Sequence, residues 1–293
     1  MLSETKKHVL SVGPFMFSVS SDIQAVHQYL EHHYRSNLVS PDSNQFVDYH
    51  VSVEHGSILR RLYKPQVIFK FNHRVPFKPL PLSQAHAMLE WGMNWVISKN
   101  AHQYLIIHAA TLEKDGKGII ISAPSGSGKT TLCAYLVSQG WRLLSDELAL
   151  ISPEDELLYG LARPMNLKNR SIDLMRPYFD HSDFSQVAKD THKGEICLLR
   201  PPSGSSTNAH IGVKPSLLVF VKYSASEECY SEPVDKCLAL TEIIQNSFNF
   251  GLLNKKGFQY ARNLVDNTKA VYIEYNNFKS CENAIVDALN SEE

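Results

Sequence analysis

The chain has 293 residues, of which 43% are hydrophobic and 20% charged, a composition typical of a folded globular protein and not of a disordered or fibrous one. Its 29 Lys and Arg residues nearly balance 30 Asp and Glu residues, so no overall field favours a nucleic acid or a membrane as partner. The five cysteines form no C-x-x-C pair, which predicts a cytoplasmic protein without disulfide bonds or a thiolate zinc site. No apolar run is long enough to cross a bilayer.

Two domains are predicted, an N-terminal α+β domain over residues 1–100 and an α/β domain over residues 101–293. The first contains no catalytic motif, and the apolar stripe of its second helix is more typical of a core than of a binding site. We expect this domain to recruit a substrate or to pack against the second one. Its predicted elements are helices 21–34 and 82–99 and strands 46–53 and 66–71.

From residue 104 the pattern becomes strand, tight turn, strand, glycine-rich loop, helix and strand, the order of an α/β nucleotide-binding unit. Residues 152–210 are rich in Pro, Ser, Asp and basic residues, so we expect a functional loop or flap there, most flexible at 201–206. The remaining predicted elements are strands 104–112, 117–122, 141–147, 216–223 and 270–275 and helices 129–139, 234–248, 258–267 and 281–290.

The run 119–131 joins a β-branched strand to a glycine-rich turn and the start of a helix. It matches the phosphate-binding pattern G-x-x-x-x-G-K-[ST] except at Ala123, where alanine is tolerable if φ is negative. Lys129 would reach the β- and γ-phosphates of ATP, and Thr130 the Mg²⁺. A serine-glycine turn without a ligand is the alternative. The residues predicted to bind the nucleotide are Ser125, Gly126, Ser127, Gly128, Lys129, Thr130 and Thr131.

An acidic pair, Asp146 and Glu147, closes the next strand, only 17 residues after Lys129. We expect one carboxylate of the pair to bind Mg²⁺ and the other to act as the general base for an attacking hydroxyl. Because neighbouring strand residues point to opposite faces, only one of the two is expected to reach the γ-phosphate, and we choose Asp146. Two solvated charges at a strand end are the alternative.

Asp115 and Gly116 separate two apolar runs, which predicts a two-residue hairpin turn. The corresponding register would set His108 opposite Ala123, at the mouth of the phosphate loop. A histidine there could bond the γ-phosphate or orient a carboxylate. Packing in the core explains it equally well.

Together these segments resemble the bacterial HPr kinase/phosphorylase superfamily, especially the HPr kinase-related kinases of family A. The resemblance implies a P-loop kinase domain akin to phosphoenolpyruvate carboxykinase, which uses ATP and Mg²⁺ to phosphorylate a protein serine. It also implies phosphate binding by Gly126, Gly128 and Lys129, metal contact by Thr130, and chemistry at Asp146 assisted by His108. The matching segments are 105–110, 123–131, 142–147, 163–164, 167–169 and 190–194.

The chain departs from this family at Glu147, where HPr kinases have a second Asp, and at 164–170, where they have a glycine-rich segment. The resemblance therefore does not identify HPr as the substrate. We expect a kinase acting on a serine or similar hydroxyl of a peptide or small protein, with Lys168, Arg170 and Lys193 contacting an acidic or phosphorylated substrate. A P-loop ATPase or nucleotide-sensing switch and a small-molecule kinase are the alternatives, and a homo-oligomer is compatible with the sequence.

Overall fold

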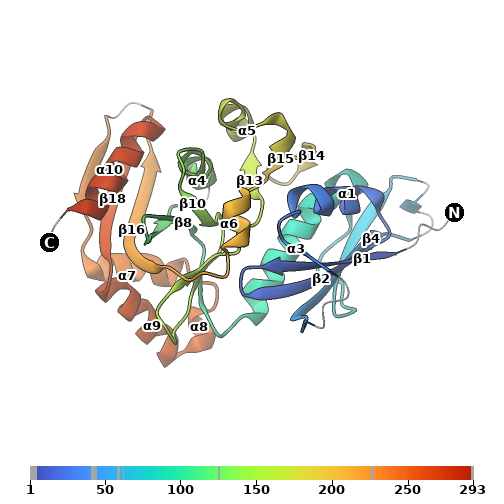
Figure 1. The fold of residues 1–293 in the computed structure, drawn as a ribbon, viewed down its shortest axis with the longest axis horizontal. Helices are drawn as coiled ribbons and strands as arrows, with labels where there is room; N and C mark the ends of the chain where they lie inside the picture. Colours follow the sequence, from blue (N-terminus) through green and yellow to red (C-terminus); the bar gives the residue numbers. More distant parts are fainter. Residues whose placement is uncertain are drawn as a thin grey trace.

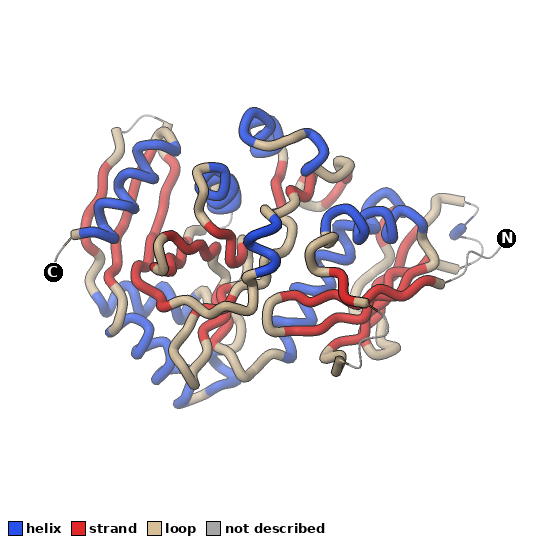
Figure 2. The backbone as a smooth tube through the Cα atoms, in the orientation of Figure 1, coloured by secondary structure: helices blue, strands red, loops and turns tan. Residues whose placement is uncertain are grey.

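The computed structural model describes residues 5–40, 45–57, 60–61, 63–124, 126–225 and 228–291. Two six-stranded and two three-stranded sheets, together with the helices that cover them, make up a mixed α/β fold in these residues (Figures 1 and 2). None of the helices in this part of the chain combines the length and apolar character that a membrane span requires.

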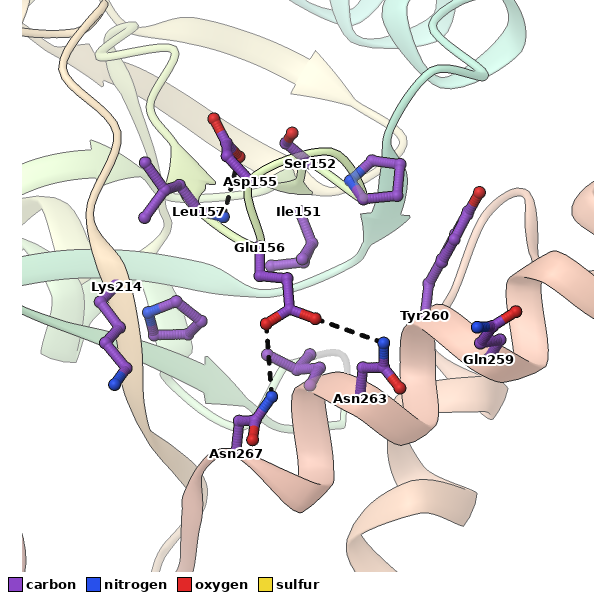
Figure 3. Close-up of a pocket in the computed structure, with 13 residues that line it drawn as sticks. Ile151, Ser152, Asp155, Glu156, Leu157, Lys214, Gln259, Tyr260, Asn263 and Asn267 are labelled. Carbon is purple, nitrogen blue, oxygen red and sulfur yellow. Dashed lines mark hydrogen bonds between the residues drawn. The ribbon is translucent and has the colours of Figure 1, made fainter.

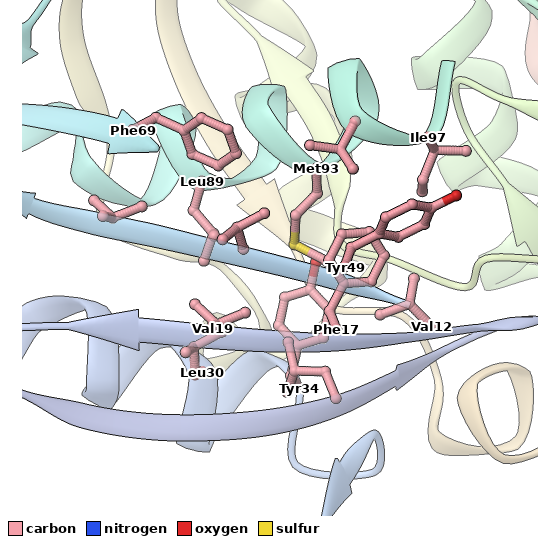
Figure 4. Close-up of a cluster of buried hydrophobic side chains, with 14 of the residues drawn as sticks. Val12, Phe17, Val19, Leu30, Tyr34, Tyr49, Phe69, Leu89, Met93 and Ile97 are labelled. Carbon is pink, nitrogen blue, oxygen red and sulfur yellow. The ribbon is translucent and has the colours of Figure 1, made fainter. Parts of the chain in front are cut away.

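The first sheet and its helices are β1 (Lys6–Val12), β2 (Phe15–Ser21), α1 (Gln24–His33), β3 (Leu38–Val39), β4 (Tyr49–His55), β5 (Gln66–Phe71), β6 (Leu80–Pro81), η1 (Leu82–Gln84) and α3 (Ala85–Asn100). The strand order is β3-β1-β2-β4-β5-β6. Leu89, Met93 and Ile97 recur every fourth residue on α3 and pack over Phe17 and Val19 of β2 (Figure 4). Both predicted helices and both predicted strands are confirmed here, whereas β1, β2, β3 and β6 were not predicted.

The central sheet and its helices are β8 (Ala110–Lys114), β9 (Lys117–Ser122), α4 (Lys129–Ser138), β10 (Arg142–Ser145), β16 (Lys214–Tyr223), β17 (Tyr230–Pro233), α7 (Lys236–Gln245), α8 (Phe250–Leu253), α9 (Lys255–Asp266), β18 (Lys269–Tyr275) and α10 (Phe278–Asn290). Parallel strands β9, β16 and β18 lie at its centre. Ile119 and Ile121 pack with the apolar residues of α4 and α10, while Ile120 packs with those of α7 and α9. The sheet is therefore the middle of three layers (Figure 1).

Residues 152–210 do not form the loop or flap that we expected. They contain β12 (Leu158–Tyr159), β13 (Met165–Lys168), α5 (Arg170–Met175), η2 (Arg176–Tyr178), η3 (His181–Asp183), β14 (Ala188–Thr191), β15 (Gly194–Leu199) and α6 (Ser203–Thr207). Strands β13, β15 and β14 form a sheet whose Met165, Leu167, Cys197 and Leu199 are fully buried beside α4. These short apolar runs, hidden among polar residues, give the segment a core.

The predicted strand 104–112 is in fact two strands in two sheets. Residues Leu105–Ile107 form β7, which pairs with β11 (Ala149–Ile151), whereas β8 pairs with β9 and β10. The hydrophobic cluster of the first sheet also includes Ile106 and Leu148. Apolar contacts are thus continuous across residue 100.

Candidate functional site

The glycine-rich loop leads directly from β9 into α4. Gly126 and Gly128 adopt left-handed conformations with φ of 87° and 90°, which favour glycine. A Cβ atom on Gly126 would meet no other atom within 4 Å, so the backbone angle and not a lack of space requires glycine there. Ala123 does not have a positive φ, which meets the condition for alanine at this position. Ser125 lies outside the described residues.

Helix α4 begins at Lys129, and the N–H groups of its first turn have no acceptors within the helix. Such groups, together with the helix dipole, form a site for an anion. The hydroxyl of Thr131 is engaged with Ser171 at 2.6 Å, while Thr130 is half-buried. Thr130 is therefore the better placed of the two threonines to contact a bound ion.

Two strand interruptions meet beside this loop. Thr111 pairs with Ser145, and Ile107 pairs with Ala149. Between these two pairs, the residues of the two segments do not pair with each other. His108 lies in one interruption, and Asp146 and Glu147 lie in the other. The shared break brings an imidazole and two carboxylates together.

A pocket of about 350 Å³ joins the break to the loop. It is lined by His108, Pro124, Gly126, Gly128, Lys129, Thr130, Thr131, Asp146, Glu147, Asn166, Lys168, Asn169, Ser171 and Lys193. Both carboxylates line it, although we expected only one of them to reach a γ-phosphate. The reason is that β10 ends at Ser145, and the alternation of a strand no longer applies beyond it.

The two carboxylates have different partners. Asp146 is buried, and its Oδ2 accepts a hydrogen bond from the main-chain N–H of Asn166 at 2.9 Å. Oε2 of Glu147 accepts from Nδ2 of Asn94 at 2.6 Å. Burial and the neighbouring charge of Glu147 raise the pKa of Asp146 to about 7. Asp146 can therefore take up and release a proton near neutral pH.

Lys129 and His108 also line this pocket. Nζ of Lys129 donates to the main-chain oxygen of His108 at 3.4 Å, and burial lowers the pKa of this lysine to about 8. Burial and the charge of Lys129 lower the pKa of His108 to about 4, so its imidazole is neutral at pH 7. The ring stacks on Phe248 with centroids 5.7 Å apart.

The hairpin register that was predicted from Asp115 and Gly116 is confirmed, with Lys114 opposite Lys117. The ladder nevertheless stops at the pair Ala110–Ile121, so His108 is not paired with Ala123. His108 reaches the pocket because the chain leaves the ladder at this point.

Several side-chain oxygen atoms that line the pocket are candidate ligands for a metal ion. They come from Thr130, Asp146, Glu147 and the side chain of Asn166, whose buried Oδ1 has no hydrogen-bond partner among the described residues. In that part of the chain, no three His, Cys, Asp or Glu side chains gather so that they could hold a metal by themselves. Such a set suits Mg²⁺, which binds through one or two carboxylates together with substrate phosphates.

The three basic residues proposed to contact a substrate do not all lie together. Lys168 and Lys193 line the pocket of the carboxylates, whereas Arg170 lines an adjoining pocket. Asn169 places Lys193, since its Nδ2 donates to the main-chain oxygen of Lys193 at 3.1 Å and its Oδ1 accepts from Glu195 N–H at 3.0 Å.

The adjoining pocket has a volume of about 600 Å³ and shares Gly126, Gly128, Thr131 and Ser171 with the first. It is rich in aromatic side chains, which suit the stacking of a flat ring system. These aromatic residues are Tyr135, Tyr178, Tyr223, Tyr275 and Phe278. A polar pocket thus opens into an aromatic one at the phosphate loop.

A further pocket of about 330 Å³ lies beside α9 (Figure 3). None of the predicted site residues lines it. The carboxylate of Glu156 accepts hydrogen bonds from Asn263 at 3.3 Å and Asn267 at 3.4 Å, so its charge is already partnered.

Sequence reasoning missed Asn94 and Asn166. Asn94 lies within the apolar helix that we assigned to the core, and Asn166 lies in the segment that we took for a loop. A polar amide between Met93 and Trp95, in an apolar stretch of the helix, was the one signal available for Asn94.

Comparisons with known proteins leave the family unassigned. The profile of a family described as "SynChlorMet cassette protein ScmC" matches residues 83–165, less than half of the chain. No curated protein matches. Among solved structures, the chain is similar to the Hpr(Ser) kinase/phosphatase from Coxiella burnetii, with 12% identity and a TM-score of 0.29 over 62% of this chain and 97% of that one. A likeness this weak assigns no activity, so function has to be inferred from the site.

Proposed function

We propose that this chain is a kinase that transfers the γ-phosphate of ATP to a hydroxyl group of a peptide or small protein. The observation that carries the proposal is the shared strand break, which sets Asp146 and Glu147 in one pocket with Lys129 at the start of α4. Anion-binding amides, a lysine and a proton-accepting carboxylate are the groups that phosphate transfer requires.

The two pockets suit the two parts of ATP, its phosphates and its nucleoside. The loop amides and Lys129 would bind the phosphates, and the aromatic pocket would receive the nucleoside. Mg²⁺, bound by Thr130 and Glu147, would neutralise charge on the β- and γ-phosphates. Asp146 would accept the proton of the attacking hydroxyl, because its pKa of about 7 matches the working pH of a general base.

His108 has a different task in this scheme. Because its imidazole is neutral at pH 7, it can share a hydrogen bond with a phosphate oxygen or a carboxylate without adding charge. Lys168 and Lys193 would hold an anionic group of the acceptor in the same pocket.

The test is incubation with γ-labelled ATP, Mg²⁺ and a library of serine- and threonine-containing peptides, followed by mass spectrometry of the acceptors. We expect label on a hydroxyl with the parent protein and with Lys256→Ala, an exposed lysine of α9, but not with Lys129→Ala. Release of free phosphate at one rate, whether or not peptides are present, would replace the kinase with a hydrolase. Label on a small molecule alone would replace the peptide acceptor.

A further inference from the structure

A chain of buried and half-buried polar side chains links the first hundred residues to Glu147. Asn94 of α3 donates from Nδ2 to Oε2 of Glu147 at 2.6 Å and accepts at Oδ1 from Nη1 of Arg163 at 2.6 Å. One side of the amide meets a carboxylate and the other a guanidinium, so a flipped amide would satisfy neither. The orientation of Asn94 is therefore determined from both sides.

Arg163 is itself held by Glu90 of α3 and by Tyr34, the residue that follows α1. Its Nη2 donates to the main-chain oxygen of Glu90 at 2.7 Å and also to the Glu90 carboxylate, and its Nε donates to the hydroxyl of Tyr34 at 3.2 Å. The other carboxylate oxygen of Glu90 accepts from the hydroxyls of Tyr29 at 2.8 Å and Tyr34 at 2.7 Å. Burial opposes the charge of Arg163, but the carboxylate of Glu90 raises the pKa of the guanidinium above its usual range.

Stability of the fold does not by itself explain why this network is polar. The side chains of Arg163 and Glu90 are only 6% and 4% exposed, and a well-packed apolar core of similar volume is often as stable as such a buried ion pair. A fully partnered polar network does hold its members in one geometry, however. Its last member on the side of the pocket is Glu147.

We infer that Asn94 is a positioning residue for Glu147, so that the first hundred residues complete the phosphate-transfer site instead of forming a detachable module. The inference rests on the proposed function, which gives Glu147 its task. Partners that orient a metal ligand or catalytic carboxylate typically contribute about 10–100-fold in activity or metal affinity.

The substitution Asn94→Asp separates positioning from packing. The aspartate keeps the shape of the side chain and can still accept from Arg163, but it offers Glu147 a negative charge in place of a donor. We expect Asn94→Asp to keep its fold and to bind ATP, while its turnover falls by about 10–100-fold. Asn100→Ala is the matched control, because Asn100 ends the same helix and its side chain bonds only to Val96 in the described structure.

A double-mutant cycle with Glu147→Gln decides whether Asn94 acts through Glu147. Turnover is measured as phosphate transferred and as phosphate released, for the parent, both single variants and the double variant. In the double variant the new glutamine amide can donate to the new aspartate, so adding Asn94→Asp to Glu147→Gln should change turnover by less than about twofold. The same loss in both backgrounds, or no loss with Asn94→Asp in the parent, would overturn the inference. If the parent releases phosphate without transferring it to an acceptor, the kinase proposal fails. The double-mutant cycle can then still be measured as phosphate released, and it still tests the role of Asn94.

Discussion

Asp146 and Asn166 are joined by a hydrogen bond of 2.9 Å, in which the main-chain N–H of Asn166 donates to Oδ2 of the carboxylate. This bond favours the ionised form of Asp146, but burial and the charge of Glu147 outweigh it and raise the pKa to about 7. The strand break thus provides a carboxylate that is geometrically fixed yet changes its charge near neutral pH.

Replacing Asp146 with asparagine should separate chemistry from binding. The amide keeps the shape of the side chain but cannot accept the proton of a hydroxyl, so phosphate transfer should fall by about 10²–10⁴-fold. Titration of a fluorescent ATP analogue should show binding within a few-fold of the parent. Near-normal transfer by Asp146→Asn, together with an inactive Glu147→Gln, would show that Glu147 is the base.

The same variant should be more stable than the parent above pH 7. The pKa of Asp146 is raised from 3.8 to about 7 on folding, so the folded state holds this proton more tightly than the unfolded state. The contribution to stability is present at low pH and is lost as the pH rises from about 4 to about 7. Thermal unfolding should therefore show a higher Tm for Asp146→Asn at pH 8 and a smaller difference at pH 5. An equal difference in Tm at pH 8 and pH 5 would contradict a raised pKa for Asp146.

Binding of ATP should weaken in mildly alkaline solution. Because burial lowers the pKa of Lys129 to about 8, the ammonium form that attracts phosphate prevails below this pH and is lost above it. Between pH 7 and pH 9 we expect a loss of up to about tenfold in affinity. Lys129→Arg remains charged over this range, so its affinity for ATP should change less with pH. An equally steep loss of affinity in this variant would mean that another group titrates.

Gly126 should tolerate alanine poorly although there is room for the methyl group. Its φ of 87° costs an L-residue about 1–2 kcal/mol, so the loop would relax and its N–H groups would turn away from the phosphates. We expect ATP affinity to fall by about 5–30-fold. Gly204→Ala, whose Cβ also meets no atom but whose φ is not left-handed, should bind ATP as the parent does. Equal ATP affinities for the two variants would contradict phosphate binding by the loop that contains Gly126.

The buried pair of Glu90 and Arg163 should be sensitive to the loss of one charge. Glu90→Gln leaves the guanidinium without its partner, and we expect urea unfolding to show a loss of about 3–5 kcal/mol. Asp266→Asn, which breaks the exposed pair with Arg262, should cost no more than about 0.5 kcal/mol. Similar losses for the two variants would mean that the Glu90 pair is not isolated from water.

The glycine-rich turn between β9 and α4 could be predicted because its determinants are neighbours in the chain. The residues that need a left-handed backbone, Gly126 and Gly128, lie within the three residues before the lysine that begins α4. The hairpin register could be predicted for the same reason, since a two-residue turn dictates how the flanking strands pair.

Contacts between distant segments could not be predicted. The interruption at His108 matters only because the chain is also interrupted at the same level between β10 and β11, about forty residues later. Asn94 reaches Glu147 from a helix whose pattern indicates only a core. Likewise, the four residues of β13 are too few to show a period, and their Pro- and Ser-rich surroundings hide them.

The central claim is that the loop at the start of α4 binds a nucleoside triphosphate through Lys129, and calorimetric titration of Mg·ATP at pH 7 tests it most directly. We predict saturable binding to the parent and to Lys256→Ala, and at least about a tenfold loss of affinity for Lys129→Ala, because Lys129 is the only cationic residue in the sequence of the loop. Binding of Mg·ATP to Lys129→Ala with the affinity of the parent would contradict the account.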